Sequence, residues 1–527
     1  MSALAGTAPL LRLWLRRDRV MIPLWVLALT ATAAGTASSF ATLYGTPAEL
    51  HVFAAGVKGN AATVALYGPV GAETVGGLVA WRNGVIGAVL VAVMSVLLVI
   101  RHTRAEEEEG RLELVGATAV GRRAPLTSGV LTSLTAGAVL SLTTFLGLTG
   151  TGMAVAGSAA FALAWFASGL VFTGVAAVTA QLSESTRTAR GIAFAVLGGV
   201  YLLRAAGDTA DAAWLSWLSP LGWASLLRPF ADERWWVAGL SLVLAAALLA
   251  AAFALADRRD VGAGIFPPRL GPAAGSLSGS AALAWRLQRG SFFGWLAAFT
   301  VYGGVIGGIA PSVADLVGES TATQEIFATL GGEGAFTDAF LAVTFGMLAL
   351  IATVFTVQSV LRMRGEESGG RLEPLLATGL NRIRWAAGHT VIALAGTLVL
   401  LTVGGLACGV VYGLASDDLG QIGRLAAAGA VQAPPAWVVG GAALLLFGAL
   451  PRQAYAAWGL FGACILLTLV APILDLPAWV LDLSPFAHAP ALPGGEIEPL
   501  PVTVLLVLAA ALAAAGLTTW RRRDLTP

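Results

Sequence analysis

The residues whose types and spacing best suit recognition chemistry lie in two acidic segments of one pattern. The first, RAEEEEGRLELVGATAVGR, covers residues 104–122, and the second, RGEESGGRLEPLLATGLNR, covers residues 364–382. At a shift of 260 residues, and without a gap, ten of the nineteen positions are identical. One acidic run alone would be interpreted as a solvated helix end. The recurrence of Glu-Glu followed by Gly-Arg-Leu-Glu indicates a more specific role.

Each copy predicts a short helix at the edge of the membrane. Carboxylates in the first turn of a helix are favoured by its dipole. Leu112 and Val115 in the first copy, and Leu372 and Leu375 in the second, are spaced i, i+3 and therefore share one face. A short amphipathic helix in this position is suited to docking into a groove of a partner protein.

Motifs for chemistry carried out by the chain itself are missing from the sequence. Lys58 is the only lysine and follows Val57, so the GxxxxGK[ST] phosphate-binding loop is absent. HExxH, CxxC and the strand–helix nucleophile turn are also absent. The two cysteines, Cys408 and Cys464, lie in apolar stretches, where they are expected to be small buried hydrophobes. We expect no enzymatic activity, no bound cofactor and no metal site in this chain.

The composition indicates the elements that must position these segments. Of 527 residues, 57% are hydrophobic and 12% are charged, and the mean hydropathy is +0.80. Soluble domains carry about 25% charged residues. Intrinsic disorder is excluded by the hydrophobicity, and the balance of 31 basic against 30 acidic residues argues against a nucleic-acid binder. The sequence predicts a multi-span membrane protein.

Twelve apolar stretches are long enough to cross a bilayer as helices. They lie near residues 20–40, 77–100, 125–149, 153–180, 190–206, 235–256, 292–310, 338–361, 388–414, 430–450, 454–473 and 501–520. With the N-terminus inside, 25 of the 31 basic residues fall on the inner side and 6 on the outer side. This asymmetry predicts a multi-pass protein of the cell membrane with both termini in the cytoplasm.

The internal repeat divides the chain into two halves. Residues 1–256 form a first six-span half, residues 257–290 a cytoplasmic linker with an interfacial helix, and residues 291–527 a second six-span half. An even number of spans leaves both halves in the same orientation, so the repeats are parallel. Both halves end in Arg-Arg-Asp, at residues 258–260 and 522–524. We therefore predict an all-α integral membrane fold of about twelve transmembrane helices.

Three further features are candidates for function. Basic and apolar residues alternate at 11–19, before the first span, and again at 281–289, before the seventh. Each segment is explained either as an ordinary positively charged flank of a span or as a helix lying along the membrane interface. Arg82 and Asn83 lie inside the second span, where either snorkelling or a substrate path explains them. Outer segments before the sixth and twelfth spans carry aromatic residues and Ser-Pro breaks, which fit interfacial anchors or an outer gate. Their candidate residues are Trp214, Trp217, Pro220, Trp479 and Pro485.

The pattern E-x-G-R-L-E-x-L/V-x-A-T after the second span resembles the ABC-2 type permeases of ATP-binding-cassette exporters, which have the type V exporter fold. The duplicated form resembles actinobacterial permeases for polyketide antibiotics or multiple drugs. The resemblance implies that the segment is a coupling helix resting on a separate ATPase subunit. The coupling residues would be Glu106, Glu107, Arg111, Leu112, Glu113, Glu366, Glu367, Arg371, Leu372 and Glu373.

The same resemblance implies two ATPase copies that hold ATP and Mg²⁺, and short re-entrant helices that close the outer mouth. The second copy departs from the first at Ser368, Gly369 and Pro374. Since proline is tolerated only in a first helical turn, the second helix is expected to start later or to bend.

We therefore expect a permease subunit that exports hydrophobic or amphiphilic, antibiotic-like small molecules with energy from a separate ATPase. The alternative is an ion-coupled secondary multidrug antiporter, which a six-plus-six parallel repeat also allows. Sparse charge inside the spans argues against it, because a coupling ion needs a titrating or coordinating site. A membrane subunit without transport activity is the third hypothesis.

Overall fold

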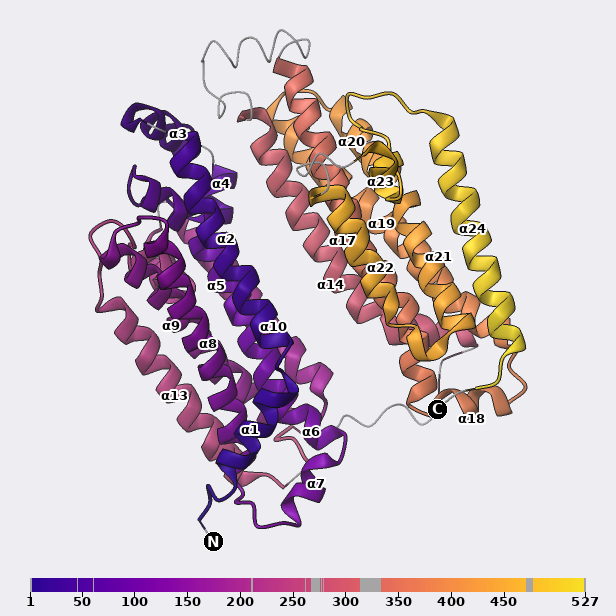
Figure 1. The fold of residues 1–527 in the computed structure, drawn as a ribbon, viewed down its shortest axis with the longest axis horizontal. Helices are drawn as coiled ribbons and strands as arrows, with labels where there is room; N and C mark the ends of the chain where they lie inside the picture. Colours follow the sequence, from indigo (N-terminus) through magenta and orange to yellow (C-terminus); the bar gives the residue numbers. More distant parts are fainter. Residues whose placement is uncertain are drawn as a thin grey trace. The chain divides into compact units, whose positions relative to one another are not determined.

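The structure is a computed structural model that divides into two compact units, Met1–Gly271 and Pro272–Pro527, each described by itself (Figure 1). It describes all residues except 1, 45, 60, 210–211, 261, 267–274, 276, 278, 313–332, 471–476 and 526–527. Within the described residues every regular element is a helix.

Eleven helices in the described part of the chain are long and apolar enough to cross a membrane. A shorter apolar helix, Ala456–Thr468, lies where the sequence predicts the eleventh of twelve spans, at 454–473. Its last predicted residues, 471–473, lie outside the described residues. The prediction of an all-α, multi-pass membrane protein of about twelve spans is confirmed.

The first unit contains α1 to α13. Their bounds are α1 Thr7–Arg17, α2 Met21–Leu43, α3 Pro47–Gly59, α4 Ala61–Tyr67, α5 Val75–His102, α6 Arg104–Glu108, α7 Arg111–Gly116, α8 Ala124–Gly150, α9 Val155–Leu182, α10 Thr186–Thr209, α11 Trp214–Leu218, α12 Gly222–Leu226 and α13 Val237–Arg258. Figure 1 shows α1, α6 and α7 at one end of this unit, hereafter its loop end, and α3 and α4 at the opposite end.

Close packing of α5 on α9 forms the centre of the first unit. A Cβ added at Gly87 would lie 2.0 Å from the ring of Trp165, so only glycine allows this approach. The Trp165 indole N–H donates to the Gly84 carbonyl at 3.1 Å. Inside a bilayer the hydrophobic effect does not drive helices together, so close packing and hydrogen bonds between helices, such as this one, hold them in contact.

The second unit contains the remaining helices. Their bounds are α14 Ser280–Ile309, α17 Glu333–Ser368, α18 Leu372–Ala377, α19 Arg382–Ala415, α20 Gly420–Ala430, α21 Ala433–Ala449, α22 Ala456–Ile465, α23 Ala478–Leu481 and α24 Pro499–Arg522, with 3₁₀ turns at Ala310–Ser312, Pro451–Gln453 and Pro485–His488 and a π segment at Leu466–Val470. Figure 1 shows α18 and the C-terminus at one end, the loop end of this unit, and α20 and α23 at the other.

Helices α14 and α19 approach each other through glycines. A Cβ added at Gly303 would lie 2.1 Å from the Gly404 carbonyl oxygen, and one at Gly307 would lie 2.3 Å from that of Cys408. Gly303 and Gly307 are four residues apart and therefore share one helix face, as in small-residue motifs of membrane helices.

The two basic segments before the first and seventh spans fold differently. In the first unit, α1 ends at Arg17 and a break at Asp18 separates it from α2. In the second unit, residues 281–289 form no separate helix but begin the continuous α14. The polar contacts of the two segments differ accordingly: Asp18, at the break, contacts His102 and Arg101, whereas Gln288 bonds His389 on α19 at 2.8 Å from within the continuous α14.

Candidate functional site

The two repeated acidic segments fold into related turns at the loop ends. In the first, α5 stops at His102, Thr103 has φ −121° and ψ −86°, and α6 follows. In the second, α17 runs unbroken to Ser368. Both then turn through a glycine with positive φ, Gly110 at 71° and Gly370 at 66°, a conformation that glycine adopts without strain.

The short helices after these glycines are α7 and α18. By the repeat, Arg111 corresponds to Arg371, but α7 starts at Arg111 whereas α18 starts one residue later, at Leu372. Pro374 then falls in the first turn, where the missing N–H costs nothing. The later start expected from that proline is present in the structure.

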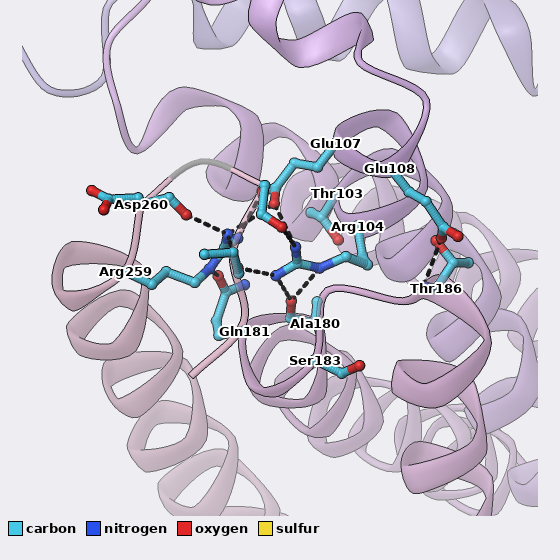
Figure 2. A network of polar contacts seen from close by, with 12 residues as sticks. Thr103, Arg104, Glu107, Glu108, Ala180, Gln181, Ser183, Thr186, Arg259 and Asp260 are labelled. Carbon is cyan, nitrogen blue, oxygen red and sulfur yellow. Dashed lines mark hydrogen bonds and ion pairs between the residues drawn. The ribbon is translucent and has the colours of Figure 1, made fainter. Parts of the chain in front are cut away.

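A carboxylate in each segment is held by two arginines. Glu107 accepts two hydrogen bonds from Arg259, at 2.7 and 2.8 Å, and forms an ion pair with Arg104 at 2.8 Å (Figure 2). We call Glu107, Arg104 and Arg259 the first clamp. The Glu107 and Arg259 side chains are only 10% and 8% exposed. A bidentate bond between an arginine and a carboxylate is stronger and more specific in its geometry than a neutral hydrogen bond.

The second segment repeats this arrangement. Glu367 accepts two hydrogen bonds from Arg523, both at 2.7 Å, and forms an ion pair with Arg364 at 3.2 Å. We call these three residues the second clamp. Arg259 and Arg523 are the second arginines of the two Arg-Arg-Asp sequences. The repeated chain ends therefore join the repeated acidic segments.

Glu106 and Glu366, which precede the glutamates of the two clamps, stabilise the turns that pass through Gly110 and Gly370. Glu106 accepts from Arg111 at 2.7 and 2.9 Å and from Arg17 at 2.5 Å. In the second copy, Glu366 forms ion pairs with Arg371 and Arg362, both at 2.9 Å. The hydrogen bonds to Glu106 raise the pKa of the Arg111 guanidinium above its usual value.

The first clamp also gathers the ends of other helices. Arg104 donates to the Ala180 carbonyl near the end of α9 at 2.6 and 2.9 Å, and Arg259 donates to the Gln181 amide oxygen at 2.7 Å. Glu108 accepts from the Thr186 backbone N–H at the start of α10 at 2.7 Å. Figure 2 shows the contacts of Arg104 and Arg259 grouped together, with the bond between Glu108 and Thr186 to one side of them. The loop is thus attached to α9, α10 and α13.

The N-terminal helix is attached to the same loop end. His102 and Asp18 are both fully buried and lie 2.5 Å apart, and Arg101 approaches Asp18 at 3.3 Å. The Trp14 ring packs against His102 with 4.7 Å between centroids. The Gly121 backbone N–H donates to the Ala5 carbonyl at 2.9 Å. α1 and the segment after α7 therefore support each other.

Most of the predicted coupling residues point inward. The side chains of Glu106, Glu107, Glu366 and Glu367 are 6%, 10%, 7% and 2% exposed, and Leu112 and Leu372 are buried. Arg111 and Arg371 are partly to fully exposed. Glu113 and Glu373 are exposed on α7 and α18, and Leu114, beside Glu113, is 75% exposed. Of the ten residues, Glu113 and Glu373 are the carboxylates free to face a partner.

The candidate substrate-path residues separate in the structure. Asn83 is buried, and its amide donates to the Val79 carbonyl at 3.5 Å, within its own helix. Arg82 is exposed and lies over the Tyr67 ring, 4.5 Å from its centroid. A role for these residues in a substrate path stays a prediction.

The outer segments form short broken helices in both units. Pro220 lies between α11 and α12, and Pro485 begins a 3₁₀ turn after α23. The preceding serines anchor the breaks: Ser219 donates to the Val200 carbonyl of α10 at 2.6 Å, and Ser484 lies 2.9 Å from the Thr468 hydroxyl.

The aromatic residues of these segments are mainly on the surface. Trp214 and Trp479 are 63% and 68% exposed, and Trp217 stacks on Trp236 with 5.6 Å between centroids. Exposed tryptophans near helix ends suit the membrane interface. Their gating role stays a prediction.

No group of three or more His, Cys, Asp or Glu among the described residues could hold a metal ion. Cys408 and Cys464 are both free and buried.

Sequence reasoning missed Arg259 and Arg523 as partners of the acidic segments, and it missed the buried pair of Asp18 and His102. The repeated Arg-Arg-Asp was the available signal for the arginines. The pair of Asp18 and His102 had no repeated signal, because it occurs in one half only.

The helices and the duplicated loop define an all-α, multi-pass membrane protein with two repeats of one unit. One family, described as "Multidrug efflux system permease Rv1217c, C-terminal domain", matches the chain twice, at residues 9–255 and 277–521. The chain is also 44% identical to the multidrug efflux system permease protein Rv1217c of Mycobacterium tuberculosis (strain ATCC 25618 / H37Rv), over 99% of this chain and 96% of that protein. The chain belongs to this family of permeases.

Proposed function

We propose that this chain is the permease subunit of an ATP-driven exporter and works with two copies of a separate ATPase. The observation that carries the proposal is the duplicated clamp, which fixes a short helix at the loop end of each unit and leaves one carboxylate exposed on it. A binding surface that occurs once per repeat suits a partner that binds twice.

In this proposal Glu113 and Glu373 contact basic residues of the ATPase. ATP and Mg²⁺ bind to the ATPase, and both termini and both loop ends of this chain face the cytoplasm. When the ATPase closes on ATP, it displaces α7 and α18. Because the first loop is bonded to α9, α10 and α13, its displacement is passed to membrane-spanning helices and changes the side from which the substrate path is open.

The class of transported molecule is inferred from the name of the related permease and from the apolar character of the spans. The related protein is named a multidrug efflux permease, and the candidate spans among the described residues of this chain are long apolar helices. Apolar walls with few polar groups accept varied hydrophobic or amphiphilic molecules. We therefore propose export of drug-like small molecules.

The test is a charge reversal at the two exposed carboxylates. The double variant Glu113→Arg with Glu373→Arg should lose the co-purifying ATPase and drug-stimulated ATP hydrolysis while remaining folded. The control is Glu496→Arg with Glu498→Arg, which changes charge equally at exposed positions before α24. Undiminished drug-stimulated hydrolysis would contradict the docking role. Transport that needs no ATP and collapses with the proton gradient would favour an ion-coupled antiporter.

A further inference from the structure

The second arginine of each Arg-Arg-Asp sequence has a function that the sequence pattern alone did not assign. Arg259 follows α13 directly, and Arg523 follows α24 directly. Each reaches a glutamate of its own unit that is more than 150 residues earlier in the chain, with separations of 152 for Glu107 and 156 for Glu367. The two bidentate pairs occupy corresponding places and have little solvent exposure, which sets them apart from surface ion pairs, whose contribution to stability is small.

The neighbours of these arginines limit how they can move. Arg523 also stacks over Trp520, 4.6 Å from the ring centroid, and lies 5.2 Å from that of Phe447. Its backbone carbonyl accepts from Arg382 at 2.6 Å, at the start of α19. Arg259 is bonded to Gln181 and Glu107 at the same time. The guanidinium groups are therefore fixed in orientation, as a bidentate bond to a carboxylate requires.

The linker strengthens the first clamp. The backbone N–H groups of Ile265 and Phe266 donate to the carbonyls of Gln181 and Leu182, both at 3.0 Å, so the chain after α13 folds back along the end of α9. Arg104 donates to the Ala263 carbonyl at 3.2 Å in this folded segment. The first clamp thus holds the beginning of the chain that leads to the second unit.

We propose that Arg259 and Arg523 are positioning residues. Arg259 locks the loop that carries α7 to α13, and Arg523 locks the loop that carries α18 to α24, so that displacement of either loop by the ATPase moves the last membrane-spanning helix of that unit. This inference rests on the proposed function and adds the mechanical connection. Without the lock, α7 or α18 can be displaced while α13 or α24 stays in place, and ATP is hydrolysed without matching transport.

The chain provides a matched control for each arginine. Arg258 and Arg522 are the immediately preceding residues, have the same charge and are exposed at the ends of the same helices. Arg259→Ala should lower the amount of drug transported per ATP hydrolysed by about fivefold in proteoliposomes of the complete complex, and Arg523→Ala should do the same. Arg258→Ala and Arg522→Ala should leave this ratio unchanged. Arg→Lys at 259 or 523 should give an intermediate ratio, because a lysine keeps the charge and loses the bidentate bond.

A double-mutant cycle tests whether the pair acts as one unit. Glu107→Ala combined with Arg259→Ala should lower the ratio no further than the more severe single variant does. Additive losses would show that the two residues act separately and would overturn the proposal, as would an Arg259→Ala ratio equal to that of Arg258→Ala.

A second readout does not depend on the ATPase. Ala117 and Ala377 are exposed at corresponding positions of the two loops and can each be replaced by cysteine and spin-labelled in the full chain in nanodiscs. Arg259→Ala should increase label mobility at 117, and Arg523→Ala should increase it at 377, each without changing the other loop. Unchanged mobility would overturn the lock. If no ATPase partner exists, the proposed function fails, whereas this mobility still decides whether the arginines hold the loops.

Discussion

Two glutamates of the second loop, six residues apart, should differ strongly in how much their substitution by alanine destabilises the protein. Glu367 is 2% exposed and is bonded to Arg523 and Arg364, whereas Glu373 is exposed on α18. Removing one partner of a buried ion pair costs about 3–5 kcal/mol, because the remaining charge is left uncompensated. Surface substitutions away from such features stay within about 0.5 kcal/mol.

The contacts that remain after Glu367→Ala reduce the expected cost. Arg523 keeps its stacking on Trp520 and a hydrogen bond to the Asp524 carbonyl at 3.0 Å. We therefore expect a loss at the lower end of that range, about 3 kcal/mol, which lowers the ratio of folded to unfolded protein by roughly a hundredfold. Glu373→Ala should change the free energy of unfolding by less than about 0.5 kcal/mol.

The assay is reversible unfolding of the purified chain in mixed dodecylmaltoside and dodecyl sulfate micelles, followed by tryptophan fluorescence. Glu107→Ala in the first loop, compared with Glu113→Ala, repeats the experiment in the other unit. Equal destabilisation by Glu367→Ala and Glu373→Ala would refute the distinction between a buried clamp residue and an exposed docking residue.

Three further outcomes follow from other contacts. Gly303→Val should abolish the α14–α19 packing and the yield of monodisperse protein in size-exclusion chromatography, because its Cβ would lie 2.1 Å from a backbone oxygen, whereas Gly304→Val, whose nearest neighbour is 3.8 Å away, should be tolerated. Trp14→Ala should destabilise the protein by about 3–5 kcal/mol in the same unfolding assay, since Trp14 is 2% exposed, and Trp214→Ala, at 63% exposure, should cost far less. Hydrogen bonds from Lys58 and then His51 lower the pKa of the partly exposed Glu73 carboxyl from 4.5 to about 2. Because the folded pKa is the lower one, the stabilisation is present above pH 4.5 and is lost as the pH falls through about 2. Hydrogen exchange in α3 should therefore rise over this interval relative to the intrinsic rate, and a Glu73→Gln variant that showed the same rise would contradict this.

The spans and the duplicated loop could be predicted from the sequence because their causes are local. A run of about twenty apolar residues predicts a membrane-spanning helix. The repeat at a shift of 260 residues needs no gap and can be recognised by comparing the two segments of the sequence directly. The same local reasoning treated the basic segment at 281–289 like that at 11–19. The structure separates them: Asp18 pairs with His102 at the break between α1 and α2, whereas Gln288 bonds His389 from within the continuous α14.

The orientation of the loop side chains could not be predicted in this way. A run of carboxylates beside a membrane is expected to be solvated, and that expectation holds for Glu113 and Glu373. Glu107 and Glu367 are buried because arginines more than 150 positions later return to them. Such long-range pairs depend on how the helices pack, and only the repeated Arg-Arg-Asp indicated them.

We propose above that this permease depends on a separate ATPase. The most direct measurement is affinity purification of the tagged chain from its own host in mild detergent, with mass spectrometry of the eluate and an assay of vanadate-sensitive ATP hydrolysis. A permease driven by a separate ATPase should bring with it a stoichiometric partner with a phosphate-binding loop and should show drug-stimulated hydrolysis. A single chain without hydrolysis, reproduced after crosslinking in cells, would contradict it.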